Sequence, residues 1–180
     1  MINKEFINTW SNKYDENVSK RDKELEEKIR SEITHLLQDR KVKHITRDIL
    51  YDIVDWKAPR IRKNVLKNRK EFAEEVTKRC FLSPDEQFKI EVLTILKGIQ
   101  YRVASAILHF CFSSEYTIMD SRAWWSLREK KELQKDYKIK DDFEHWQRYL
   151  NVCRKISHKY DCSLRQLDKA LWQYSKENQK

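Results

Sequence analysis

The stretch Leu96-Lys97-Gly98-Ile99-Gln100-Tyr101-Arg102-Val103-Ala104 contains the only glycine of the 180-residue chain. Apolar spacing predicts a helix ending near Leu96 and a second helix beginning near Tyr101. A glycine after a helix end supplies the left-handed conformation that lets the chain reverse. Such a turn also points the free N–H groups of the next helix outward, where they favour a phosphate. Taken alone, the stretch equally fits an ordinary capping glycine between two packed helices.

The rest of the chain shows the same scarcity of turn-forming residues, with Pro59 and Pro84 as its only prolines. This scarcity predicts an all-α protein of helices joined by short connections. Ser83 before Pro84 has the pattern of a helix start, and Ser163 has the pattern of a capping box. Helices are expected at residues 20–39, 45–56, 60–68, 70–81, 84–97, 101–112, 119–127, 142–158 and 164–177.

Length and composition favour one compact multi-helix domain over residues 1–180. Hydrophobic residues make up 39% of the chain and charged residues 37%. No apolar run approaches the length of a membrane span, and the N-terminus lacks the apolar core of a signal peptide, so a cytoplasmic protein is expected. The net charge of +9 favours a polyanionic partner such as nucleic acid, although a merely solvated surface also accounts for it.

The four cysteines, Cys80, Cys111, Cys153 and Cys162, lie in or beside apolar helical stretches, and none form a Cys-x-x-Cys pair. They are therefore expected to be reduced thiols. A metal set of Cys153, His158 and Cys162 has too few ligands and no zinc spacing, so no metal site is predicted.

The segment from Leu93 to Arg122 resembles the helix-hairpin-helix superfamily of DNA glycosylases, which includes endonuclease III and 8-oxoguanine DNA glycosylase. In that family the hairpin is followed by a helix, a short loop and an essential aspartate. Here Asp120 follows Gly98 at the same offset as in endonuclease III-like sequences. The chain also looks like small proteins classed as 8-oxoguanine glycosylase-like, with further similarity expected in residues 56–60 and 167–172.

This resemblance implies a hairpin at about 84–112 and a catalytic segment at about 113–127. Asp120 would be the catalytic carboxylate, because breaking an N-glycosidic bond develops positive charge on the sugar that a fixed carboxylate can stabilise. Asp120 also stands directly before the stretch Ser121-Arg122-Ala123-Trp124-Trp125, where an aspartate commonly caps a helix and has no other role.

Departures from the family refine this expectation. Arg102 stands where bifunctional members carry the lysine that forms a Schiff base, and a guanidinium cannot serve as that amine. The resemblance therefore implies a monofunctional enzyme that leaves an abasic site. Lys97 and Gln100 replace the proline and second glycine of the family hairpin. The C-terminal cysteines are too few for an iron–sulfur cluster, so no cofactor is expected apart from a monovalent cation at the hairpin.

The implied partner is double-stranded DNA carrying a damaged or modified base, bound by a monomer in the nucleoid. Base flipping needs an aromatic pocket, for which we consider Trp56 and one of Trp124 or Trp125, although core packing is the commoner fate of such residues. The predicted DNA-binding residues are Lys97, Gly98, Ile99, Gln100, Arg102, Lys57, Arg60 and Arg122.

The identity of the base stays open among oxidised guanine, alkylated purines and an enzymatically modified base of foreign DNA. The biological role is accordingly either repair or defence. Two other functions also fit the residues: a non-catalytic helix-hairpin-helix DNA-binding module, and a helical interaction protein whose charge is incidental.

Overall fold

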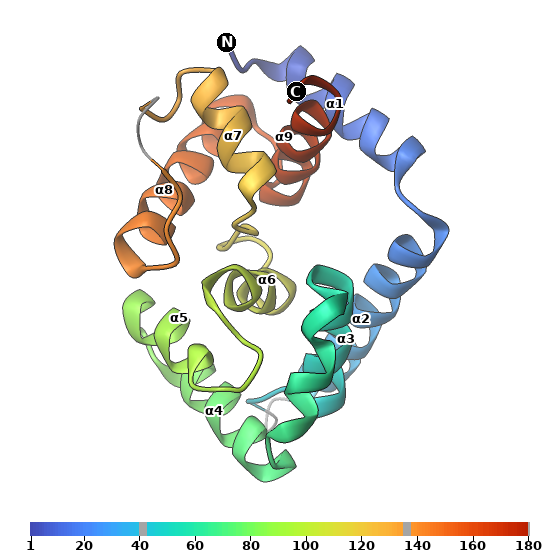
Figure 1. Ribbon diagram of the computed structural model, residues 1–180, viewed down its shortest axis with the longest axis vertical. Helices are drawn as coiled ribbons and strands as arrows, with labels where there is room; N and C mark the ends of the chain where they lie inside the picture. Colours follow the sequence, from blue (N-terminus) through green and yellow to red (C-terminus); the bar gives the residue numbers. More distant parts are fainter. Residues whose placement is uncertain (40–42, 135–137, 180) are drawn as a thin grey trace. The chain divides into compact units, whose positions relative to one another are not determined.

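The computed structural model describes residues 1–39, 43–134 and 138–179, and within these ranges it contains helices and no strand (Figure 1). The prediction of an all-α protein is thus confirmed. None of the described helices is long and apolar enough to cross a membrane. The elements are α1 (Lys4–Asn17), α2 (Lys20–Gln38), α3 (Arg47–Lys57), the 3₁₀ helix η1 (Pro59–Lys67), α4 (Lys70–Leu82), α5 (Glu86–Thr94), α6 (Tyr101–Cys111), α7 (Ser121–Glu129), α8 (Phe143–Tyr160) and α9 (Leu164–Asn178).

The contacts of the chain divide it into two compact units. Unit 1 consists of Met1–Val18 and Phe112–Lys180, and unit 2 consists of Ser19–Cys111. Each unit has its own core. The expectation that the whole chain forms one domain stays a prediction.

Unit 2 is built from α2 to α6, with η1 between α3 and α4. Helix α6 is its most apolar element, and every residue from Val103 to Phe110 is buried. Helices α2, α3 and α5 all pack on α6, and α3 brings Ile49, Leu50 and Ile53 into the core. A helix buried nearly all round requires such neighbours, because its apolar surface exceeds one stripe. Unit 2 therefore surrounds the helix that follows the Gly98 turn.

The turn between α5 and α6 has the backbone that the lone glycine predicts. Gly98 has a φ of +88°, in the left-handed region that favours glycine. The Ile99 N–H donates to the Leu96 carbonyl at 3.0 Å. The buried Asn68 side chain holds the neighbouring residue, accepting from the Lys97 N–H at 2.9 Å and donating to the Lys97 carbonyl at 3.1 Å. The turn is thus fixed against the end of η1.

Gly98→Ala is expected to lower the free energy of unfolding by about 2 kcal/mol, because the left-handed backbone alone costs about 1–2 kcal/mol with a side chain. The added Cβ would also lie 2.9 Å from the Asn64 Cβ, which is too close. Urea unfolding measures the change, with Lys97→Ala at the exposed neighbouring position as the control. Equal stability of the two variants would contradict this account of the turn.

Unit 1 joins the first helix of the chain to the last three. Helix α9 contacts α1, α7 and α8, and Figure 1 shows α1 and α9 lying side by side. Its core holds large rings, among them Trp124, Trp146 and Tyr149. A second aromatic group on α1 and α9 surrounds a cation, since the Lys130 ammonium lies 4.0 Å from the ring centre of Tyr174 and 5.0 Å from that of Phe6. The N-terminal helix is thus an integral part of unit 1.

Three differences separate the observed helices from the predicted ones. Helix α1 lies outside every predicted range, and the helix predicted at 60–68 is the 3₁₀ helix η1 (Pro59–Lys67). Helix α5 begins at Glu86, because the Asp85 carboxylate accepts from the Phe88 N–H at 2.6 Å and is the N-cap in place of Ser83. The predicted capping by Ser163 is confirmed, since its hydroxyl accepts from the Gln166 N–H at 3.0 Å.

Candidate functional site

Asp120 is the N-cap of α7, and its carboxylate accepts a hydrogen bond from the Arg122 N–H at 2.8 Å. The residue is half-buried and has an extended backbone. The sequence prediction that Asp120 begins a helix is therefore confirmed. Its role as the catalytic carboxylate stays a prediction.

The segment that leads to Asp120 is anchored in the core of unit 1. All four preceding residues, 116–119, are buried. The Tyr149 hydroxyl donates to the Ile118 carbonyl at 3.1 Å, two residues before the carboxylate. The Tyr149 ring stacks on Trp124 with the ring centres 5.7 Å apart. Asp120 is consequently held from both sides, by α7 after it and by this anchor before it.

The buried Tyr149 hydroxyl also lies close enough to two carboxylates of unit 1 to be affected by their charge. Its pKa lies well above the ordinary value, chiefly because the hydroxyl is buried, and also because Cys153, Asp168 and Asp120 would repel the phenolate. Burial raises the pKa by disfavouring the charged form. Tyr149 therefore stays a neutral donor, and two carboxylates, Asp168 and Asp120, lie near enough to act on it.

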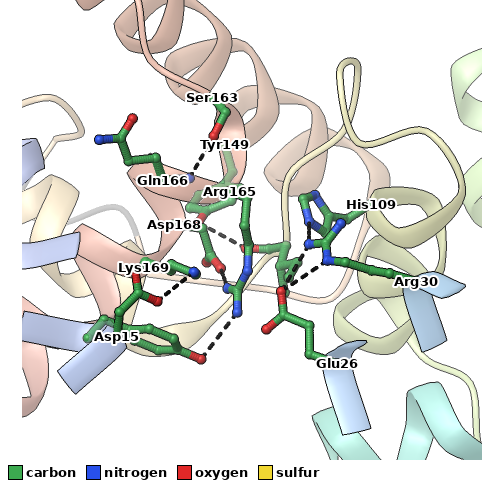
Figure 2. A network of polar contacts seen from close by, with 12 residues as sticks. Asp15, Glu26, Arg30, His109, Tyr149, Ser163, Arg165, Gln166, Asp168 and Lys169 are labelled. Carbon is green, nitrogen blue, oxygen red and sulfur yellow. Dashed lines mark hydrogen bonds and ion pairs between the residues drawn. The ribbon is translucent and has the colours of Figure 1, made fainter. Parts of the chain in front are cut away.

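The Asp168 carboxylate is almost buried, and Arg165 neutralises it (Figure 2). The Arg165 Nη1 lies 2.5 Å from the Asp168 Oδ2, and the Arg165 Nη2 donates to the Tyr14 hydroxyl at 3.2 Å. Figure 2 also shows Lys169 reaching Asp15 on α1, at 2.6 Å. These contacts tie α9 to α1 around a buried ion pair. They leave the two carboxylates near Tyr149 in different settings, one at a helix start and one paired.

Arg122 lies on the first turn of α7 with its guanidinium carbon 5.5 Å from the ring centre of Trp172. Trp172 in turn meets Tyr14 edge to face, with ring centres 5.5 Å apart. Arginine on an aromatic face keeps its N–H groups available at the edge of the plane. Arg122 forms no ion pair with a carboxylate in the described part of the chain, so its charge stays available to an anion.

The predicted DNA-binding residues of unit 2 lie around the α5–α6 turn and η1. Lys97 and Gln100 are exposed in the turn, whereas the Ile99 side chain is 3% exposed and belongs to the core. Arg102 lies half-buried on the first turn of α6. Lys57 ends α3, and Arg60 is exposed on η1. The identity of α5, the turn and α6 as a helix-hairpin-helix motif stays a prediction.

The three candidate pocket tryptophans differ in their surroundings. Trp124 is 1% exposed and is stacked with Tyr149 and His145, so its ring belongs to the core of unit 1. Trp125 is half-buried and stacks on Tyr174 with ring centres 6.0 Å apart. Trp56 is half-buried in unit 2 and meets Phe110 edge to face at 5.2 Å. Of the α7 pair, Trp125 therefore has the more accessible ring.

His109, for which the sequence favours a core position, is fully buried on α6 in unit 2. Its Nε2 lies 3.2 Å from the Nη2 of Arg30, and the same Nη2 lies 2.9 Å from a Glu26 oxygen (Figure 2). The histidine is thus the buried end of a polar cluster with Arg30 and Glu26 that joins α2 to α6.

No site for a metal ion formed by three or more His, Cys, Asp or Glu occurs among the described residues. Two surface hollows of unit 1, of about 540 and 420 Å³, lie around Leu133 and Arg148, and Asp120 lines neither of them.

The four cysteines are free thiols, as predicted. Burial raises the pKa of Cys80 to about 12 and places that of Cys153 higher still. Because the thiolate is the reactive form, we expect both to resist alkylation at pH 8 in the folded protein and to react on unfolding. Mass spectrometry of peptides labelled before and after denaturation measures this, with the half-buried Cys162 as the internal reference. Labelling of Cys153 as fast as Cys162 would contradict the expectation.

Sequence reasoning did not single out Tyr149 and Arg165, which lie in unit 1 with Asp120, or Asn68, which holds the Gly98 turn in unit 2. The Arg165–Asp168 ion pair could have been predicted, because residues three apart lie on the same face of a helix. Tyr149 and Asn68 act on the backbone of distant segments, and no local pattern marks such contacts.

Comparison with protein-family models, with curated proteins and with solved structures gives no match for this chain.

Proposed function

We propose that the chain is a monofunctional DNA N-glycosylase, which flips a damaged or modified base and hydrolyses its N-glycosidic bond. The observation that carries the proposal is the setting of Asp120. Its carboxylate is half-buried at the start of α7, at the end of a segment anchored by the Tyr149 hydroxyl. A carboxylate held in this way needs to move little when positive charge develops on a nearby sugar in the transition state.

In this proposal Asp120 acts on the sugar and on water. Departure of the base leaves positive charge on the deoxyribose, which the carboxylate stabilises. The same group orients the attacking water and accepts its proton, so that water oxygen bonds to the sugar carbon and the base leaves with the bond electrons. Neutral Tyr149 contributes by holding the backbone that carries Asp120.

The remaining residues support binding in this proposal. The α5–α6 turn, with Lys97 and the positive end of the α6 helix dipole, supplies phosphate contacts. Arg122 is a further cation for the backbone of the DNA. Arg102 cannot form a Schiff base, so strand cleavage is left to other enzymes. The substrate is an oxidised, alkylated or enzymatically modified base, in repair or in defence against foreign DNA.

A gel assay tests this proposal on DNA duplexes that are plain, oxidised, alkylated or phage-modified. We expect strand breaks at the modified base only after alkali, since an abasic strand is cleaved by alkali and a monofunctional enzyme leaves it intact. Borohydride is expected to trap no covalent complex. Breaks without alkali, or a trapped complex, would contradict the monofunctional mechanism.

The alternative is a non-catalytic DNA-binding module. It is favoured by one observation, that Asp120 accepts the Arg122 N–H and thus already serves as a helix cap. Salt-sensitive DNA binding with no abasic product on any of these duplexes would favour the module over the enzyme.

A further inference from the structure

Residues 57–70 form the most basic part of unit 2. This segment contains seven Lys and Arg residues and no Asp or Glu. It includes η1 from Pro59 to Lys67 and leads directly into α4. Several lysines and arginines close together on an ordered element create a positive electrostatic potential. Where no Asp or Glu of the protein pairs with them, an anion from outside the protein can neutralise it.

The 3₁₀ geometry of η1 separates its core side from its charged side. With three residues per turn, side chains three apart lie in one row. The row of Arg62, Val65 and Asn68 faces inward: Val65 and Asn68 are buried. Arg62 forms an ion pair with Asp55 of α3, with the Arg62 Nε 3.3 Å from the Asp55 Oδ1. Arg60 and Lys63 share the next row, about 6 Å apart along the axis, and both are exposed.

The same element is fastened to the Gly98 turn. Asn68 makes both backbone hydrogen bonds to Lys97, and Gly98 packs against the backbone of Asn64 and Val65. Exposed Lys97 and the N-terminus of α6 therefore continue the charged side of η1. We call these exposed cations the η1 surface; its members are Arg60, Lys63, Lys67, Arg69 and Lys97.

The η1 surface lacks the acidic partners that several other cations of unit 2 have. Arg21 pairs with Asp55, Lys28 with Asp52, and Arg79 with Glu75. Among the described residues, no carboxylate lies within ion-pair distance of any member of the η1 surface; Lys67 bonds the neutral Asn64 amide. Their charge is therefore uncompensated within the fold.

We propose that the η1 surface binds the phosphate backbone of duplex DNA next to the Gly98 turn, and so extends the predicted hairpin contact by several phosphates. The inference rests on the proposed function only in taking DNA as the partner. Each lysine or arginine that neutralises a phosphate releases counterions, which makes affinity depend on salt. Because η1 and the turn are joined through Asn68, these cations would engage the backbone together.

The test compares Lys63→Ala/Lys67→Ala, two exposed lysines of η1, with the matched control Lys23→Ala/Lys78→Ala, two exposed lysines on α2 and α4. Both double variants remove the same charge. We expect the first to bind a plain duplex at least about tenfold more weakly at low salt, and its salt slope to fall by about 2, one for each phosphate that is no longer neutralised. The control is expected to keep the wild-type slope.

Equal slopes in the two double variants would overturn the proposal, provided that wild type binds DNA. If base release is also intact in the first variant, the η1 surface fails while the glycosylase proposal stands. If wild type binds no DNA at low salt but binds polyglutamate, the partner is an acidic protein, and both proposals fail. Circular dichroism of each variant establishes that the helices are retained.

Discussion

Asp168→Ala is expected to lower the free energy of unfolding by about 3–5 kcal/mol, because it removes the carboxylate that pairs with a nearly buried guanidinium. The side chains of Arg165 and Asp168 are 12% and 6% exposed. After the change, Arg165 retains the neutral Tyr14 hydroxyl at 3.2 Å, which cannot compensate a buried charge. Urea unfolding followed by tryptophan fluorescence measures the destabilisation.

Two comparisons isolate the buried pair. Asp15→Ala removes the more exposed pair with Lys169 on the same helix and is expected to change stability by less than about 1 kcal/mol. The double change Arg165→Met/Asp168→Leu removes both charges and is expected to recover much of the stability, since an apolar pair avoids the desolvation cost. A double variant as unstable as Asp168→Ala would show that shape, and not the unpaired charge, is responsible.

Asp120→Asn is expected to slow base release by at least about 100-fold while leaving DNA affinity within a factor of about three, because the amide removes the charge that acts in the transition state. The helix start should survive, since asparagine caps helices as well as aspartate does. Single-turnover release and the Kd for the same duplex separate the two effects.

Asp85→Asn is the matched control, because Asp85 is also an N-cap aspartate, on α5, and accepts the Phe88 N–H. The two variants make the same chemical change at the same kind of position. Equal release by Asp120→Asn and wild type would reduce Asp120 to a helix cap. An equal decrease in both variants would assign the effect to general disturbance of the fold.

Much of the helical structure could be predicted from local signals in the sequence. Ser163 caps α9 as the sequence predicts, and Thr46, a residue type that favours the same position, caps α3. The Gly98 turn follows from one residue, because a helix reversal at that point requires a positive φ. Helix caps and glycine turns depend on residues within about four positions of one another, so the sequence alone is enough to predict them.

Helix α1 shows where local reading fails. Its buried positions include Ser11 and Tyr14 beside Ile7, so its apolar stripe is weak. Two of its rings, Phe6 and Trp10, meet Tyr174 of α9, with ring centres 5.2 and 5.1 Å apart. The helix is stabilised by contacts with the far end of the chain, and tertiary packing outweighs propensity here.

The candidate functional residues could also be predicted only in part, because some of their contacts join distant segments of the chain. Asp120 and the basic residues of the turn are found from their place in the chain. The anchoring of Asp120 by Tyr149, and of Lys97 by Asn68, joins segments about thirty residues apart, for which no spacing rule exists.

The most direct test of the central claim is mass spectrometry of the small molecules that wild type releases from plain, oxidised, alkylated and phage-modified duplexes. The account predicts one free base, in amounts equal to the abasic sites formed, and none from Asp120→Asn on the same DNA. Absence of any free base from all four duplexes, with DNA binding retained, would contradict it and leave Asp120 as the cap of α7.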